Sequence, residues 1–429
     1  MTWFFPEIAS TSVSVVQAIL ALTVIFILSL SVFAIIRWSK LPSLELPSES
    51  PTLLPISVIL PTWNEEKVIS AKLDEIFSQD YPRELIEVIV IDSASTDSTI
   101  KIVENWILER GPEKTLKYRI IREDERKGKS ASINRAFSEA HPDSEILMMS
   151  DVDCRLSKGA LKRISNWFQI EEIGAVTGRQ VLLNSMQSRK ASEESSYRDF
   201  FTRMRSAESK LSSTPIFHGE CAAYRREAIS SHKLIENANA DDSQMAVSAV
   251  KSGYRAIYDS QMLFFEMAPP NGRSSRIQKV RRAQGLVRHF WRNKKMIVDR
   301  KFGDFRRIMA IEFSLHIIAP IAVLLGFLMG LAHICLVMAE PSFSSQSLGN
   351  LPAIEKTMLI SDATVFLLLL SGFLGIPFPG GRLSLTFFNY MLTLVWAQVL
   401  IIGGKSLHQW QQVTDVRDAL AEHDRKSKY

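Results

Sequence analysis

The 429-residue sequence contains only three cysteines, Cys154, Cys221 and Cys335. Their odd number and wide spacing exclude a disulfide framework and a cysteine-based zinc cluster. We therefore expect the middle of the chain to lie in a reducing compartment. The sequence also lacks repeats and low-complexity stretches, and its 46% hydrophobic and 23% charged residues exclude a disordered or collagen-like chain.

Charged residues are missing from a long stretch near the start of the chain. Residues 12–36 carry no charge, and a run of about 25 apolar residues can cross a hydrocarbon core of roughly 30 Å. A cleaved signal peptide would have basic residues before a shorter run, whereas only Glu7 is charged before this one. Arg37 and Lys40 follow the run, so the positive-inside rule predicts an outer N-terminus and a cytoplasmic domain in a multi-pass protein of the cell membrane.

Three further apolar runs occupy about residues 311–338, 358–378 and 383–402. Three crossings would place the C-terminal tail outside, but the basic residues of the tail, Arg417 among them, favour the inside. Either the tail is outside or one of the runs is re-entrant or interfacial, and the sequence leaves both alternatives open.

Large apolar and basic side chains are interspersed in residues 286–307, just before the first of these runs. The pattern predicts a basic amphipathic segment on the cytoplasmic leaflet, and the alternative is a solvated helix with one face against the core. The chain then divides into an N-terminal anchor, a soluble domain, this interfacial segment, a membrane region and a charged tail, over residues 1–40, 41–285, 286–307, 308–404 and 405–429.

The net charge is only +5, and the soluble domain lacks a basic run interleaved with aromatic residues. We therefore expect membrane lipids and phosphate-bearing ligands as partners, and no nucleic acid.

The soluble domain is predicted to alternate strands with helices. Short apolar runs rich in Val and Ile, separated by stretches of helical spacing, predict strands over residues 54–61, 85–92, 116–123 and 145–151. The first of these stretches, residues 65–79, is predicted to be a helix. This order indicates an α/β fold with a parallel sheet built from βαβ units. Ligands of such sheets bind at the carboxyl ends of the strands, which selects residues 61–66, 92–99 and 151–153.

Two carboxylates, Asp151 and Asp153, follow the fourth predicted strand. At positions i and i+2 they can bind one hard cation together, and Mg²⁺ or Mn²⁺ prefers such oxygen ligands and bridges diphosphates. Asp92 follows the second strand and can accept hydrogen bonds from a base or a ribose. The alternatives are that Asp151 and Asp153 cap a loop, and that Asp97 or Thr96 in the turn after Asp92 caps a helix.

The segment from Pro61 to Glu66 offers donors and acceptors to a nucleotide, or only caps a helix. Residues 126–130 end like a P-loop, but the first glycine of that motif would fall at Glu123, which excludes a Walker NTPase. Lys129, which follows Gly128 at a predicted helix start, can still meet a phosphate.

Asp241 and Asp242 are neighbouring carboxylates about 90 residues beyond Asp151. Such a pair raises one pKa, which suits a general base, and the alternative is an ordinary helix N-terminus. Residues 278–282, Gln-Lys-Val-Arg-Arg, supply cations that either neutralise a departing diphosphate or contact lipid phosphates.

Seven strings in this order resemble glycosyltransferase family 2, whose soluble domain has the Rossmann-like GT-A fold with a mostly parallel sheet. They are SVILPTWNEE (57–66), VIVIDSASTDST (88–99), KGKSASINRA (127–136), SDVD (150–153), HGECAAYRREAI (218–229), ADDSQMA (240–246) and QKVRR (278–282). With transmembrane helices at both ends, the chain is similar to hyaluronan, chitin and cellulose-type synthases and related transferases.

The resemblance implies a role for each matching position. The residues implied for the nucleotide sugar are Pro61, Glu65, Asp92, Lys129 and Asp151; those for the metal are Asp153 and Asp151; the base is Asp242, with Asp241 before it; and those near the diphosphate and the acceptor are Gln278, Arg281 and Arg282.

Three residues in two of the motifs depart from the family pattern. Ser93 and Ala94 stand where the family commonly has Asp-Gly after Asp92, and Arg282 stands where processive members have the Trp of QxxRW. Because that Trp would help line an acceptor site, its absence weakens the case for a long-polymer synthase.

We therefore expect an inverting hexosyltransferase that moves a sugar from a nucleotide sugar, a UDP-sugar rather than a GDP-sugar, to a lipid-linked or glycan acceptor. Asp242 would take the proton of the acceptor hydroxyl as it attacks C1, and Mg²⁺ or Mn²⁺ on Asp153 would stabilise the leaving diphosphate. The alternatives are a processive polysaccharide synthase that couples polymerisation to export, and an inactive membrane scaffold.

Overall fold

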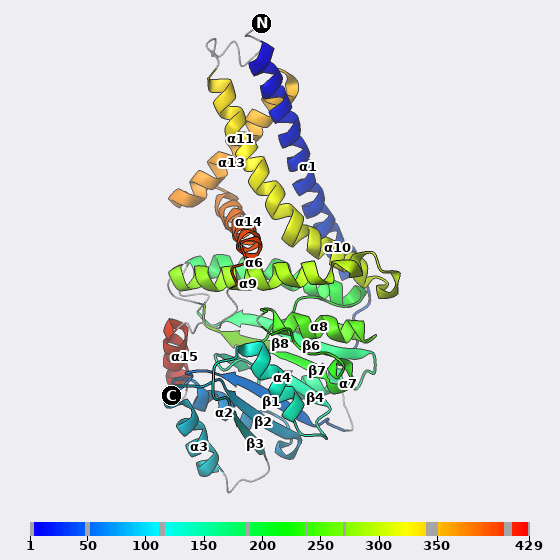
Figure 1. Cartoon of the computed structure of the whole chain (residues 1–429), viewed down its shortest axis with the longest axis vertical. Helices are drawn as coiled ribbons and strands as arrows, with labels where there is room; N and C mark the ends of the chain where they lie inside the picture. The colour runs from blue at the N-terminus through cyan, green and yellow to red at the C-terminus, as the bar shows by residue number, and fades with distance from the viewer. Residues whose placement is uncertain are drawn as a thin grey trace. The chain divides into compact units, whose positions relative to one another are not determined.

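The structure is a computed structural model that describes residues 4–47, 52–110, 116–184, 189–236, 238–268, 272–339, 351–406 and 414–427 (Figure 1). The chain forms two compact units. The membrane-helix unit comprises Met1–Phe33 and Ala310–Lys405, and the sheet unit comprises Ala34–Met309 and Ser406–Tyr429. The C-terminal tail therefore belongs to the same unit as the predicted soluble domain.

The sheet unit is built on an eight-stranded sheet with the strand order β3-β2-β1-β4-β7-β6-β8-β5. Its strands are β1 Ile56–Thr62, β2 Ile86–Asp92, β3 Lys117–Arg122, β4 Ile146–Met149, β5 Cys154–Leu156, β6 Ile173–Leu182, β7 Ala222–Arg225 and β8 Arg255–Glu266. The first four strands pair in parallel, as predicted. β7 runs antiparallel between β4 and β6, and β5 runs antiparallel to β8, so the sheet is mixed and mostly parallel.

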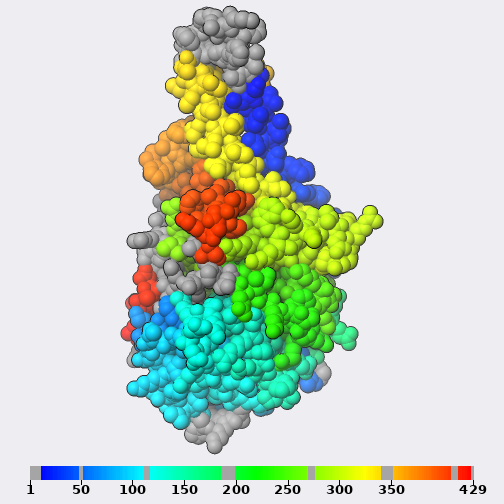
Figure 2. All heavy atoms as spheres, in the orientation of Figure 1, coloured from blue at the N-terminus to red at the C-terminus, as the bar shows by residue number. Residues whose placement is uncertain are grey.

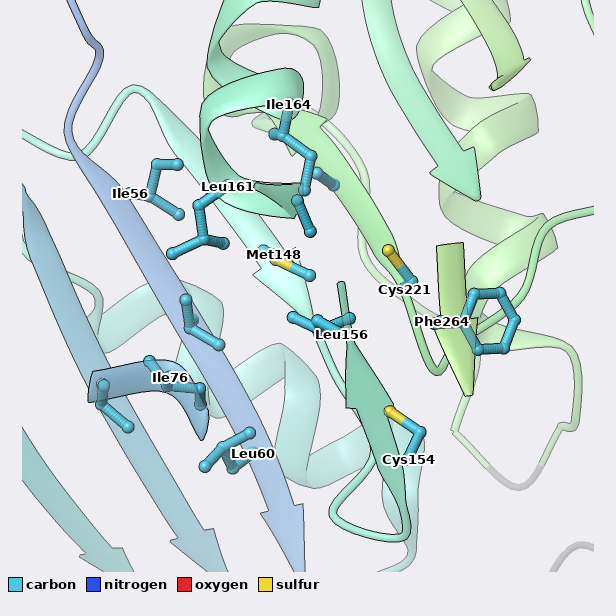
Figure 3. Close-up of a cluster of buried hydrophobic side chains, with 14 of the residues drawn as sticks. Ile56, Leu60, Ile76, Met148, Cys154, Leu156, Leu161, Ile164, Cys221 and Phe264 are labelled. Atoms are coloured by element: carbon cyan, nitrogen blue, oxygen red, sulfur yellow. The ribbon is translucent and has the colours of Figure 1, made fainter. Parts of the chain in front are cut away.

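Residues of β1 and β2 are buried throughout, which explains why both strands read as unbroken apolar runs. Alternate side chains enter opposite faces of the sheet. Ile56, Val58 and Leu60 belong to one apolar cluster, and Ile59 belongs to the other. Figure 3 shows the first cluster, in which Leu161 and Ile164 of α5 (Ala160–Trp167) lie over the same face.

Helices cover both faces of the sheet (Figure 1). They are α2 Ile69–Phe77, α3 Thr99–Arg110, α4 Lys129–Glu139, α5, α6 Arg189–Leu211, α7 Arg226–Ile229, α8 Asp241–Lys251, α9 Gly272–Asn293 and α15 Thr414–Ser427. Four residues at the start of the segment predicted as a helix, from Glu65 on, precede α2. This stretch is held instead as a loop, because Thr99 Oγ1 accepts a hydrogen bond from the Glu65 amide at 2.7 Å and Asp97 accepts one from the Glu66 amide at 3.2 Å.

The segment predicted to lie at the membrane, residues 286–307, falls within the sheet unit. It contains the end of α9 and short 3₁₀ turns, and Phe290, Met296 and Phe305 are buried. Trp291 and Val298 are exposed.

Within the described ranges, four helices are long and apolar enough to cross a membrane: Thr11–Ser39, Phe305–Met338, Ala353–Leu374 and Gly381–Ile402. They correspond to α1 (Phe4–Ser39), α10 with α11 (Phe305–Phe313 and Ala319–Met338), α13 and α14. Apolar helices at both ends of the soluble domain were predicted, and this is confirmed. A π-helical turn, Ser314–Ile318, directly precedes Pro320, whose missing N–H disturbs the regular helical hydrogen bonding.

Polar side chains join the helices inside the membrane-helix unit. Gln17 of α1 donates a hydrogen bond to Asp362 of α13, and Ser14 lies 3.0 Å from the ring of the fully buried His333 of α11. Because a polar group in hydrocarbon needs a partner, these contacts favour the association of the three helices.

Candidate active site

The loops that follow three parallel strands are tied to one another at one edge of the sheet. The Ser93 amide donates to the Thr62 carbonyl at 2.9 Å, and the Ser150 amide donates to the Ile59 carbonyl at 3.0 Å. The β1–β2 register also places Thr62 opposite Asp92. The polar segments that follow β1, β2 and β4 therefore share the edge at which a parallel sheet binds ligands.

Lys129 connects Asp151, in the loop after β4, with Asp241 at the start of α8. Its Nζ lies 2.6 Å from Asp151 Oδ1 and 3.6 Å from Asp241 Oδ2. Burial alone would lower the pKa of Lys129, but the two carboxylates outweigh it and raise that pKa above its ordinary value. Burial likewise opposes ionisation of Asp151, and Lys129, Arg417 and Arg281 overcome it and lower the pKa of that carboxyl.

Asp242 lies beside Lys129 and Asp151, and its pKa is shifted in the opposite direction from that of Asp151. Burial, followed by the neighbouring charge of Asp241, raises the pKa of Asp242 to about 7. An added Cβ on Gly219 would lie 3.3 Å from Lys129 Nζ and 3.8 Å from Asp242 Oδ2, which puts both groups next to that glycine. Tyr224 donates to the Asp242 carbonyl oxygen at 2.9 Å and fixes the backbone there. Asp242 is thus a carboxyl that can exchange a proton near neutral pH.

A second cation, Arg417 of α15, joins Glu65 to Asp153. Its Nη2 lies 2.8 Å from Glu65 Oε1, its Nε lies 3.1 Å from Glu65 Oε2, and its Nη1 lies 3.1 Å from Asp153 Oδ2. Burial raises the pKa of Glu65 to about 7 even though Arg417 lowers it. Sequence analysis assigned Arg417 only to the basic tail, and nothing in the spacing of residues 352 positions apart could have paired it with Glu65.

The helix α9 brings further cations. Arg281 interacts electrostatically with Asp151, Asp241 and Asp153, although burial and the adjacent Arg282 lower its pKa. Arg282 pairs with Glu220 at 3.0 Å and with Glu266 at 3.4 Å. Gln278 lies one turn earlier on the same helix.

Glu220 was not among the predicted site residues. It lies in the HGECAAYRREAI string that supported the resemblance, and it contributes charge at both Lys129 and Asp242. The string therefore pointed to the right segment without identifying the carboxylate.

The remaining predicted residues lie on the β1–β2 side of this edge. Pro61 is buried within β1, and Asp92 Oδ2 accepts a hydrogen bond from the Ser95 amide at 3.1 Å. Among the residues that the structure describes, Asp92 Oδ1 and Arg126 Nη2 are buried and have no hydrogen-bond partner. The Arg126 guanidinium lies 3.5 Å from the centre of the Trp63 ring. Unpaired buried polar atoms of this kind are positioned to receive a polar ligand.

The predicted site residues thus form one charged network with Asp92 and Pro61 beside it. Lys129, Arg281 and Arg417 join the four aspartates Asp151, Asp153, Asp241 and Asp242. Within the described part of the chain, no three His, Cys, Asp or Glu side chains converge into a preformed metal site. Mg²⁺ and Mn²⁺ are nevertheless often held by one or two carboxylates plus substrate phosphates, and Asp153 already accepts a cationic group, so these residues fit a cation that arrives with a diphosphate.

Two family models match the chain. "Glycosyl transferase family 2" matches residues 57–232, and "Glycosyl transferase family group 2" matches residues 146–400, which is more than half of the chain. Among solved structures, a mannosyltransferase from Pyrobaculum calidifontis in complex with GDP-Man and Mn²⁺ is similar, with 29% identity and a TM-score of 0.73 over 92% of this chain and 100% of that one.

Curated relatives match over shorter lengths. An N-acetylglucosaminyltransferase of Rhizobium meliloti is 24% identical over 69% of both chains. The dolichyl N-acetyl-alpha-D-glucosaminyl phosphate 3-beta-D-2,3-diacetamido-2,3-dideoxy-beta-D-glucuronosyltransferase of Methanococcus voltae is 47% identical, but the match spans only 11% of this chain and 15% of that protein. These matches confirm the predicted family, and the protein belongs to glycosyltransferase family 2.

Proposed function

We propose that the protein transfers a hexose from a nucleotide-diphosphate sugar to a hydroxyl acceptor with inversion at C1, and that Asp242 is the general base. The observation that carries this proposal is the position of Asp242, a partly buried carboxyl with a pKa of about 7 beside the Lys129–Asp151 pair. A general base is most effective when its pKa lies near the working pH.

The transfer exchanges one bond to C1 for another. The acceptor oxygen bonds to C1 from the face opposite the donor, the bond from C1 to the diphosphate oxygen breaks, and the acceptor proton passes to Asp242. The nucleoside diphosphate leaves with the bonding electrons. Lys129 and Arg281, which already stand beside Asp151, supply fixed positive charge near the leaving diphosphate.

The donor would lie along the edge formed by β1, β2 and β4. We assign its nucleotide part to Pro61, Glu65 and Asp92, because Asp92 Oδ1 is buried without a partner, and its sugar-diphosphate part to Lys129 and Asp151. Asp153, with Asp151, would hold Mg²⁺ or Mn²⁺, which neutralises charge on the leaving group when bound. The Pyrobaculum structure, a complex with GDP-Man and Mn²⁺, supports a divalent cation and requires that GDP-sugars be tested beside the UDP-sugars favoured from sequence.

The acceptor would meet the site beside α9. Arg281 faces the aspartate network, and Gln278 and Arg282 lie on the same helix. We assign a lipid-linked or glycan acceptor, since the chain carries helices that can cross a membrane. Arg282 pairs with Glu220 and Glu266, and it stands where processive members have Trp, so transfer of a single sugar is favoured over polymerisation.

We further propose a cytoplasmic sheet unit in the cell membrane, because Arg37 and Lys40 follow the first apolar helix. The tail helix α15 belongs to the sheet unit, so the domain and the tail lie on one side. An even number of the three apolar helices between Met309 and Lys405 must then cross, which favours the alternative in which one run is re-entrant or interfacial.

The test is donor turnover by the full-length protein in detergent with Mn²⁺ and a panel of UDP- and GDP-sugars. Asp242→Asn should lower transfer by roughly 10²- to 10⁴-fold while the protein still binds the nucleotide. Asp143→Asn, at an exposed loop position, is the matched control and should leave both unchanged. Normal turnover by Asp242→Asn would refute the assignment of the base, and product length would separate single transfer from polymerisation.

A further inference from the structure

The guanidinium of Arg417 is held between two carboxylates that the donor site needs. It makes two hydrogen bonds to Glu65, at 2.8 and 3.1 Å, and it contacts Asp153 at 3.1 Å. Its side chain is only 4% exposed, and that of Glu65 is fully buried. Three of its nitrogen atoms are therefore engaged within the loops that follow β1 and β4.

This contact belongs to the docking of a whole helix. Val416 and Leu420 of α15 are buried in the same apolar cluster as Leu60 of β1. Asp424 of α15 pairs with Arg155 at 2.7 Å. Asp418 pairs with Lys67, so α15 is fixed next to both Glu65 and Asp153. Figure 2 shows the tail helix, in red, against the surface formed by the N-terminal part of the sheet unit.

The docking pattern is complementary in charge. Two acidic residues of α15 pair with basic residues of the sheet unit: Asp418 pairs with Lys67, and Asp424 pairs with Arg155. Lys67 and Arg155 each lie two positions after an acidic residue, Glu65 and Asp153, and Arg417 of α15 pairs with both of these. If α15 were held only by its apolar face, the buried Arg417 would have no reason to lie between Glu65 and Asp153. The arrangement neutralises two carboxylates that would otherwise be costly to bury without a positive partner.

A divalent cation on Asp153 and the guanidinium of Arg417 would lie close together. Mg²⁺ lies about 2.0–2.1 Å from its oxygen ligands. The Arg417 Nη1 stands 3.1 Å from Asp153 Oδ2 and would be repelled by two further positive charges. Loading of the donor site with such a cation therefore favours movement of the guanidinium away from Asp153.

We propose that α15 is a strap over the donor site, with Arg417 standing in the place of the divalent cation until a nucleotide diphosphate and the cation displace it. The strap ties the entry of the donor to release of the C-terminal helix. It rests on the proposed role of Asp153 as a metal ligand. The opposing possibility is that Arg417 stays in the loaded site as a ligand of the diphosphate.

Mn²⁺ binding tests the competition without relying on turnover. Binding is measured by the loss of the free-Mn²⁺ electron paramagnetic resonance signal, on the full-length protein with UDP or GDP. Arg417→Gln should bind Mn²⁺ about tenfold more tightly than the original protein, the factor that removal of a competing contact worth about 1.4 kcal/mol gives. Arg425→Gln, on the exposed side of the same helix, is the matched control and should bind as the original protein does.

Displacement of the helix has a separate readout. Val416 is buried in the docked helix, so the thiol of Val416→Cys should react slowly with a maleimide and faster once Mn²⁺ and the nucleotide are added. Glu422→Cys is exposed and should react at one rate in both states. This variant keeps Arg417, so it stays informative if Arg417→Gln fails to fold.

The outcomes separate this proposal from the one on which it rests. Weaker Mn²⁺ or nucleotide binding by Arg417→Gln, or a Val416→Cys thiol that stays protected in the loaded protein, would overturn the strap and make Arg417 a donor ligand. Unchanged Mn²⁺ binding by Asp153→Asn would instead show that Asp153 is not the metal ligand. The strap would then fall together with that metal assignment, whereas the proposed transfer with Asp242 as base would stand.

Discussion

Lys129 Nζ lies 2.6 Å from Asp151 Oδ1, so the first residue of α4 is fixed to the loop that follows the strand β4. The two residues are 22 positions apart and were predicted separately, one as a phosphate contact and the other as part of an acidic pair. Their pairing means that one ammonium supports both the Asp151 carboxylate and, at 3.6 Å, the Asp241 carboxylate.

Lys129→Met should therefore weaken nucleotide binding. The variant removes the cation that lowers the pKa of Asp151 and leaves both carboxylates to repel the diphosphate. A hydrogen bond to a charged group contributes about 1.5–3 kcal/mol, so we expect the Kd for UDP or GDP to rise roughly 10- to 100-fold in isothermal titration calorimetry. Lys127→Met is the matched control, because Lys127 is exposed and lies 3.9 Å from Glu125. Equal Kd values for the two variants would contradict the role given to Lys129.

The rate of transfer should depend on a group that titrates near neutral pH. Asp242 has a pKa raised to about 7 and, as the proposed base, would act only when deprotonated, so kcat/KM should rise with pH up to about 7 and then level off. Glu65 has a similar pKa, and Glu65→Gln distinguishes the two, since it should lower donor affinity but keep the acidic limb. A profile that is flat between about pH 5 and about pH 8, an interval that spans the pKa of Asp242, would count against Asp242.

The same shifts have a defined effect on stability. Both carboxyls have folded-state pKa values above their ordinary ones, so the native state binds these protons more tightly than the unfolded chain does. The stabilisation is fully present at low pH and is lost as the pH rises through the folded-state values of about 7. The Tm of Asp242→Asn should accordingly change less than that of the original protein across this interval.

The α9 helix approaches the start of α8 closely enough that only glycine fits at position 285. A Cβ on Gly285 would lie 2.9 Å from Asn239 Cβ and 3.2 Å from the Ala240 nitrogen. Gly285→Ala should push the loop before Asp241 and Asp242 outward and lower kcat about tenfold or more, because small displacements of a catalytic group cost large factors in rate. Overpacking should also cost about 1–3 kcal/mol of stability.

Gly159→Ala provides the comparison for Gly285→Ala. A Cβ there meets no atom within 4 Å, and the backbone φ of −100° is open to any residue. This variant should keep its Tm and its kcat. Wild-type kcat in Gly285→Ala would show that the position of α8 does not depend on α9.

Elements that depend on neighbouring residues could be predicted from sequence. The strands β1, β2 and β4 were found because each is a compact run of Val, Ile, Leu or Met, and their carboxyl ends pointed to Asp92 and Asp151. The strand β3 was found although its only aliphatic residues are two consecutive Ile. The antiparallel strand β7, Ala222–Arg225, was missed as a strand, since four residues rich in Ala carry little strand signal.

The pairing of Arg417 with Glu65 could not be predicted in this way. It depends on the packing of α15 against loops of the sheet unit, from which α15 is separated in the sequence by the whole membrane region. In sequence α15 is a polar helix with only Val416 and Leu420 to mark an apolar face. The start of α2 was missed for a related reason. Glu65 and Glu66 have ordinary helix propensity, and contacts with Thr99 and Asp97 decide their conformation.

The docking of α15 predicts that the tail and the sheet unit are accessible from the same side of the membrane. Single cysteines at Lys426 and Asp143, both exposed, should react with an impermeant maleimide in the same sealed vesicles, and a cysteine at Glu7, before the first apolar helix, should react in vesicles of the opposite orientation. Cys154 and Cys221 are buried, and Cys335→Ser removes the exposed native thiol. Labelling of positions 426 and 143 from opposite sides would contradict both the even number of crossings and the docked α15.

The side of the membrane on which the link between α13 and α14 lies then shows which helices cross. Phe378 lies in this link and is exposed, so a cysteine there reports the side on which α14 begins. Because the tail after α14 must lie with the sheet unit, labelling of position 378 from the opposite side means that α14 crosses the membrane. Labelling from the same side means that α14 does not cross and that α13 returns the chain after α11. We expect the opposite side, because α13 carries Glu355, Lys356 and Asp362 whereas Arg382 in the first turn of α14 is the only charged residue of that helix.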